Sequence, residues 1–313
     1  MIYPNTFQRA LRMFAFACCK LIVFSGLINA QNRPNRQPGD DLQAMFDAFA
    51  DNAGPFAPMF GKLSPQQVQQ LDSIKISVAE ENQFGQKVLS AYVQQLAQAK
   101  IALTKQGRDV DYLQRLLMLV KPSMNNAARY RKLDVGVMDS DGSEAFSIPG
   151  GHLLITRGLL ETAESEAAVV GVLAHELSHL DRGHQLIALK QSKLAGKQLS
   201  FQDSMMWVSL VARPFRPEQE TEADSDATKW MMAAGYEPRE LAKLLSRWDQ
   251  QQDLAMPWMQ FVPGFVKSHP DAAKRAREVL EIADQQKAKY PDATFIGTEN
   301  LLHRQPKLHR RNH

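Results

Sequence analysis

The pentapeptide His-Glu-Leu-Ser-His at residues 175–179 constrains this 313-residue chain more than any other feature. On an α-helix, residues four apart point within roughly 40° of each other, so His175 and His179 can offer two imidazole nitrogens to one metal ion. Glu176 lies about 100° around the same helix, close enough to take a proton from a water activated at that metal. So short a motif can also occur by chance. A third ligand elsewhere in the chain would favour a metal site over a chance match.

His184 follows the motif but is not expected to complete a metal site from the same helix. Nine residues separate it from His175, which places it on the opposite side of a continuous helix. The metzincin pattern would need Gly at 182 and His at 185, whereas the chain has Arg182, Gly183 and His184. Gly183 is expected to end the helix.

A second helix is expected from Pro217 to Gly235. Projected at about 100° per residue, it places Glu220 and Asp224 on a face otherwise made of Ala and Met. Burying carboxylates on such a face is costly unless a cation or hydrogen bonds meet them. The pattern predicts Glu220 as the third ligand of one zinc ion per subunit, with Asp224 orienting a ligating imidazole. An ordinary acidic surface helix is the alternative.

Short strands are expected just before the motif. Residues 132–138 and 151–156 are rich in Val, Leu and Ile, with a turn-like stretch at 139–143. Gly150 and Gly151 would expose backbone to which an extended peptide could pair, although a purely structural hairpin is equally compatible. Helical patterns at 64–105, 109–121, 238–249 and 271–289 complete the prediction: a predominantly helical α+β zincin with a small sheet beside the motif helix.

These motifs, in this order, resemble metallopeptidase family 48, the gluzincin group that includes the CAAX prenyl proteases. Residues 145–160 are similar to the family's segment before the catalytic helix, and Ser268-His269-Pro270 with Arg275 is similar to its C-terminal motif. The similarity covers roughly residues 75 to 283. One departure is Glu144, which stands where the family commonly has Asn.

The resemblance implies roles for individual residues. It makes Glu176 the general base and gives the zinc ion three ligands, His175, His179 and Glu220. His269 would stabilise the reaction intermediate or block the resting metal, and Arg275 would anchor its loop to a buried carboxylate. A substrate would run along five residues of the preceding segment: Ala145, Phe146, Ser147, Gly150 and Gly151.

The N-terminal region suggests export. Residues 1–30 contain three basic residues, no acidic residue and an apolar run at 21–27, which resembles a signal peptide cleaved after Ala30. We therefore expect a periplasmic or envelope-associated protein. An uncleaved N-terminal membrane anchor is the alternative, although Lys20 interrupts the apolar stretch.

The remaining chain divides into three predicted parts. Residues 31–63 are expected to be a linker or an amphipathic segment, which leaves peripheral membrane association open. The zinc metallopeptidase domain is expected at 64–290, followed by a basic tail at 291–313. Beyond residue 30 the 34 basic residues equal the 34 acidic ones, and no nucleic-acid-binding signature is present.

The function expected from the sequence is zinc-dependent cleavage of proteins or peptides, envelope or misfolded proteins in particular, with Glu176 as base. The alternative is an envelope chaperone or assembly factor in which the zinc site is mainly structural.

Overall fold

The structure is a computed structural model, and it describes residues 64–196, 215–251 and 272–307. The chain divides into two compact units, residues 1–69 and 70–313, and the site lies in the second. The predicted signal peptide, the segment at 31–63 and His269 lie outside the described residues.

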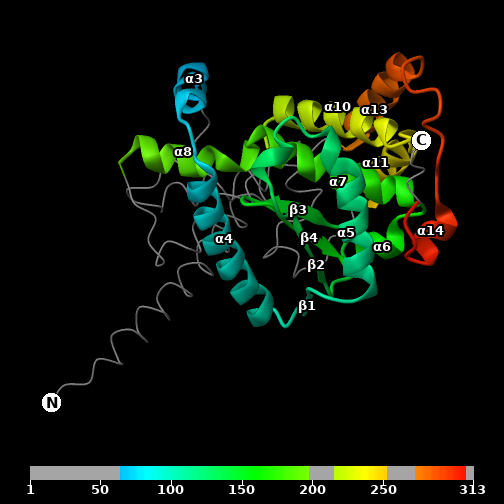
Figure 1. The fold of residues 1–313 in the computed structure, drawn as a ribbon, viewed down its shortest axis with the longest axis horizontal. Helices are drawn as coiled ribbons and strands as arrows, with labels where there is room; N and C mark the ends of the chain where they lie inside the picture. Colours follow the sequence, from blue (N-terminus) through cyan, green and yellow to red (C-terminus); the bar gives the residue numbers. More distant parts are fainter. Residues whose placement is uncertain (1–63, 197–214, 252–271, 308–313) are drawn as a thin grey trace, which may run out of the picture. The chain divides into compact units, whose positions relative to one another are not determined.

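Helices dominate the described part, which also contains one small sheet (Figure 1). The strands are β1 (Leu103–Thr104), β2 (Asp134–Met138), β3 (Ala145–Ile148) and β4 (His152–Thr156). The α-helices are α3 (Pro65–Ser73), α4 (Val78–Gln98), α5 (Arg108–Val120), α6 (Arg157–Thr162), α7 (Glu166–Arg182), α8 (Ile187–Leu194), α10 (Pro217–Ala233), α11 (Arg239–Gln251), α13 (Ala272–Gln286) and α14 (Thr298–Leu302). The predicted α+β fold, mostly helical with a sheet beside the motif helix, is confirmed.

The four strands pair in the order β1-β2-β4-β3. The central pair β2–β4 is parallel, with Val135 opposite Leu153, whereas β3 and β4 form an antiparallel hairpin. Its turn contains Gly150 and Gly151, with φ of +89° and +90°, a backbone conformation that favours glycine. The pairing leaves β3 at one edge of the sheet.

Helix α7 carries the His-Glu-Leu-Ser-His motif through the centre of the fold. It packs against α10, α11, α5 and β3 (Figure 1). Every residue from Glu166 to Asp181 is buried. Residues 167–174 are all Ala, Val, Gly or Leu, and burying each Val or Leu there contributes roughly 1.5–3 kcal/mol. Gly171 permits the close approach of α11, because a Cβ at that position would lie 2.8 Å from the Cβ of Leu241. The motif is therefore fixed by packing on all sides.

The ends of α7 are capped as its sequence suggests. The Ser165 hydroxyl accepts a hydrogen bond from the backbone N–H of Ala168 at the N-terminus. Gly183 ends the helix in the left-handed conformation, with φ of +69°.

The segment 292–307, which the sequence places in a basic tail, packs on the catalytic domain up to Lys307. The carbonyls of Ile296 and Gly297 accept hydrogen bonds from the backbone N–H groups of Ala167 and Glu166 in the first turn of α7. These N–H groups have no acceptor within the helix, so the segment satisfies them from outside. In the described ranges, no helix combines the length and hydropathy that a membrane span requires.

Candidate metal centre

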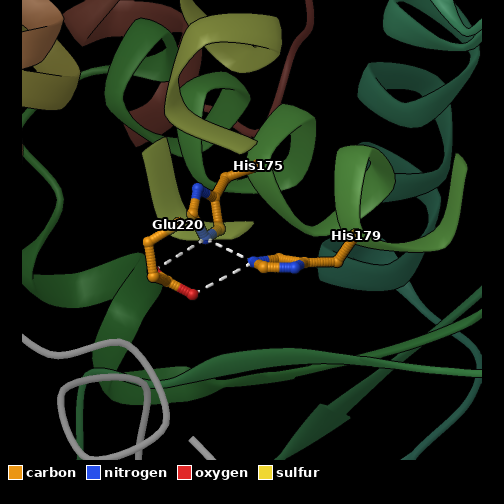
Figure 2. A group of neighbouring side chains, drawn as sticks. All are labelled: His175, His179 and Glu220. Atoms are coloured by element: carbon orange, nitrogen blue, oxygen red, sulfur yellow. Dashed lines mark hydrogen bonds and ion pairs between the residues drawn. The ribbon is translucent and has the colours of Figure 1, made fainter. Parts of the chain in front are cut away.

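Three side chains from α7 and α10 converge at one point (Figure 2). The Nε2 atoms of His175 and His179 lie 3.0 Å apart. The Glu220 carboxylate faces both rings, with Oε2 3.6 Å from Nε2 of His175 and Oε1 3.4 Å from Nε2 of His179. All three residues are buried. Two imidazole nitrogens and a carboxylate oxygen are a donor set that suits zinc.

Asp224 lies one helical turn after Glu220 and contacts the opposite side of the first histidine. Its Oδ1 is 2.8 Å from Nδ1 of His175. The contact is explained if Nδ1 carries the proton, and the Nε2 lone pair of His175 then points toward Glu220. A carboxylate in this position also increases the basicity of the imidazole.

Arg275, on α13, contacts two buried carboxylates of α10, Asp224 and Glu220. Its guanidinium contacts Asp224 and also approaches Glu220, with Nη1 3.1 Å from Oε2. Burial acts to raise the pKa of Asp224, but the Arg275 charge and the hydrogen bonds from Arg275 and His175 outweigh it and hold that pKa below its usual value. Asp224 is therefore a carboxylate at neutral pH.

His184 contacts the second histidine from outside the converging group. Its Nδ1 is 2.8 Å from Nδ1 of His179, and its Nε2 is 3.2 Å from Oε2 of Glu222. Burial lowers the pKa of His184 to about 3, so the ring is neutral at physiological pH.

The position of His184 differs from what helical projection suggests. The projection holds for a continuous helix, whereas α7 ends at Gly183 and a short 3-10 helix, His184–Leu186, follows. The sequence correctly predicts that the helix ends at Gly183, so helical geometry does not apply to His184 beyond it.

Glu176 is held by side chains from two other elements. The Ser147 hydroxyl, on β3, lies 2.8 Å from Oε2 of Glu176 and 3.1 Å from its backbone oxygen. Nε2 of Gln185 donates to Ser147 Oγ at 2.5 Å. Ser147 was expected to contact substrate, but its hydroxyl is directed at the predicted base.

The other residues of the predicted substrate segment have distinct environments. Ala145 is fully buried, whereas Phe146 is half-buried and packs edge-on against Tyr92, with ring centroids 4.8 Å apart. The Gly150 N–H donates to Glu81, and the Gly151 carbonyl accepts from the backbone of strand β2. These two backbone groups are engaged within the fold, and the peptide-pairing role suggested for Gly150 and Gly151 stays a prediction.

Two curated proteins resemble this chain over about half of its length. The "Mitochondrial metalloendopeptidase OMA1" of Schizosaccharomyces pombe is 29% identical over 168 residues, which cover 50% of this chain and 49% of that protein. The protein of the same name from Arabidopsis thaliana is 24% identical over 181 residues, covering 54% of this chain and 36% of that protein. The chain therefore spans half or less of the length of these relatives.

The expectation of an exported, periplasmic protein is wrong by this comparison, because both relatives are mitochondrial proteins of eukaryotes. The error has a physical origin. An N-terminal segment with Arg9 and Arg12 and no acidic residue fits a secretory leader, but low acidic content and arginine are equally typical of organellar transit peptides. Charge pattern alone does not separate the two.

A family model described as "Peptidase family M48" matches residues 111–283, more than half of the chain. The matched range begins in α5 and ends in α13, so it contains the motif helix, strands β2, β3 and β4 and the carboxylates of α10. The resemblance seen in the sequence is thereby confirmed, and the chain belongs to peptidase family M48.

Proposed function

We propose that this protein is a zinc-dependent endopeptidase in which Glu176 acts as the general base. The observation that carries the proposal is the buried convergence of two histidines and one glutamate, with Glu176 adjacent on the same helix. Membership of a peptidase family and the metalloendopeptidase relatives support it.

His175, His179 and Glu220 would hold the metal. When bound, zinc lowers the pKa of water and polarises the carbonyl of the peptide bond. Asp224 and Arg275 would keep the His175 ring and the Glu220 carboxylate in place, because their contacts restrict both side chains. The set is preorganised, which limits the rearrangement that metal binding requires.

Glu176 would take a proton from the attacking water and deliver it to the leaving amine nitrogen. The Ser147 contact at 2.8 Å supports this role because it holds one oxygen of the Glu176 carboxylate in place. His269 remains the predicted group for the developing oxyanion or for closure of the resting site.

The proposed substrates are proteins or peptides that extend along β3, the strand at the edge of the sheet. Phe146 is the half-buried residue of that strand, so it is the proposed contact for a substrate side chain. We extend the endopeptidase activity of the mitochondrial relatives to this chain on the basis of the shared region.

The test uses the full chain, purified with and without added zinc. We expect about one zinc per chain, cleavage of casein that a chelator stops and zinc restores, and retention of zinc without cleavage in Glu176→Gln. Zinc binding with normal cleavage in Glu176→Gln would remove Glu176 as base. Rescue of a misfolded client by Glu176→Gln, with no cleavage by the wild type, would instead support the chaperone alternative.

A further inference from the structure

The two candidate histidine ligands differ in what contacts their outer nitrogen. Nδ1 of His175 faces a carboxylate oxygen of Asp224 at 2.8 Å. Nδ1 of His179 faces another imidazole nitrogen, Nδ1 of His184, also at 2.8 Å. A carboxylate oxygen only accepts, so the contact with Asp224 places the proton of His175 on its Nδ1. An imidazole nitrogen is either a donor or an acceptor, so the direction of the His179–His184 contact depends on the groups around His184.

The hydrogen bonds around His184 define which nitrogen carries each proton. Nε2 of His184 is 3.2 Å from Oε2 of Glu222, and a carboxylate oxygen can only accept, so this Nε2 carries a proton. One of the two facing Nδ1 atoms must donate and the other accept, so Nδ1 of His184, whose proton lies on Nε2, is the acceptor. His179 must donate from its own Nδ1, which leaves its Nε2 lone pair directed at His175 and Glu220.

We propose that His184 and Glu222 form a positioning relay that fixes the tautomer of His179 for metal binding. Neither residue is a metal ligand. The inference rests on the proposed function only in taking zinc as the metal. It assigns a role to His184 and Glu222, which are not among the proposed zinc ligands.

Neighbouring contacts hold the relay in one arrangement. Phe215 stacks on the His179 ring with centroids 3.8 Å apart, which restricts rotation of the ring. Arg182 contacts Glu222 at 3.3 Å and is itself held by Asp226, with Nε 2.6 Å from Oδ2. These contacts connect the end of α7 to α10, the two helices that supply the candidate ligands.

The experiment measures the zinc dissociation constant of the full chain by competition with a colorimetric chelator. His184→Ala should weaken zinc binding about 10- to 100-fold, the usual effect of removing an outer contact of a ligand. Glu222→Lys should also weaken it, because an ammonium donor facing Nε2 favours the opposite tautomer of His184. Glu222→Gln should bind zinc nearly as the wild type does, because its amide oxygen still accepts.

Glu218→Lys is the matched control, because Glu218 is an exposed glutamate one turn earlier on α10 and makes the same charge change. Both sites are exposed, so the comparison of the two lysine variants stands even if His184→Ala fails to fold. Equal zinc affinity for Glu222→Lys, Glu218→Lys and the wild type would overturn the relay, as would an Nε2-protonated His179 in nitrogen-15 spectra of the metal-free chain. A wild-type chain that binds no zinc would instead overturn the proposed function.

Discussion

Arg275 and Asp224 form a two-point ion pair behind the candidate metal centre. Nε of Arg275 is 2.7 Å from Oδ2 of Asp224, and Nη2 is 2.8 Å from Oδ1. The same Oδ1 contacts Nδ1 of His175, so α13 supports a side chain on α7 through a carboxylate on α10. Both partners are buried, which makes the pair sensitive to loss of either charge.

Arg275→Met should destabilise the metal-free protein strongly. It leaves two buried carboxylates, Asp224 and Glu220, without their cation, and breaking a buried pair in this way costs about 3–5 kcal/mol. Urea unfolding measures the change, with Lys274→Met as control because Lys274 is the exposed neighbour on the same helix. Similar unfolding midpoints for the two variants would contradict the proposed importance of the pair.

Glu220→Ala should abolish stoichiometric zinc binding. The substitution removes the carboxylate that faces both histidine Nε2 atoms and leaves only two protein donors. Glu218→Ala, which removes an exposed carboxylate from the same helix, should keep its zinc. Metal analysis after dialysis distinguishes them, and full zinc occupancy in Glu220→Ala would exclude it as a ligand.

Ser147→Ala should lower kcat about 10- to 100-fold while zinc content and KM change little. The hydroxyl contacts the Glu176 carboxylate, and a hydrogen bond to a charged group contributes about 1.5–3 kcal/mol, equivalent to that rate factor. The measurement is steady-state cleavage of a fluorogenic casein derivative.

Ser178→Ala provides the control for Ser147→Ala. Ser178 is also buried and also donates to a carboxylate at 2.8 Å, but that carboxylate belongs to Asp226. If both serines only stabilise the fold, the two variants should lose similar stability and keep the kcat of the wild type. That result would refute the positioning of Glu176 by Ser147.

Glu80 should make the stability of α4 pH-dependent. The Lys193 contact, together with hydrogen bonds from Ser77, lowers the pKa of Glu80 to about 2, below its ordinary value of 4.5. A lowered folded-state pKa stabilises the fold above the unfolded-state pKa, and this contribution disappears as pH falls through about 2.

Comparison of the wild type with Glu80→Gln tests this linkage. The difference in unfolding free energy should be present at pH 7, decrease below pH 4.5 and shrink in high salt, since the pair is exposed. A difference that is constant from pH 7 to pH 2 would show that the charge of Glu80 is not responsible.

The sequence determined the features that depend on local periodicity. Four-residue spacing placed His175 and His179 on one side of α7, and the projection of α10 placed Glu220 and Asp224 on a buried face. The apolar runs at 132–138 and 151–156 gave β2 and β4, because β-branched and aliphatic side chains suit a buried strand. Each of these predictions needs only the geometry of one element.

Tertiary structure decided the contacts between elements. Ser147 meets Glu176 because β3 packs on α7, and His184 meets His179 because the chain leaves the helix at Gly183. The packing of residues 292–307 against the first turn of α7 likewise has no local signature. Periodicity fixes which face of a helix is apolar, but the partner of a buried polar group depends on the docking of segments far apart in the sequence.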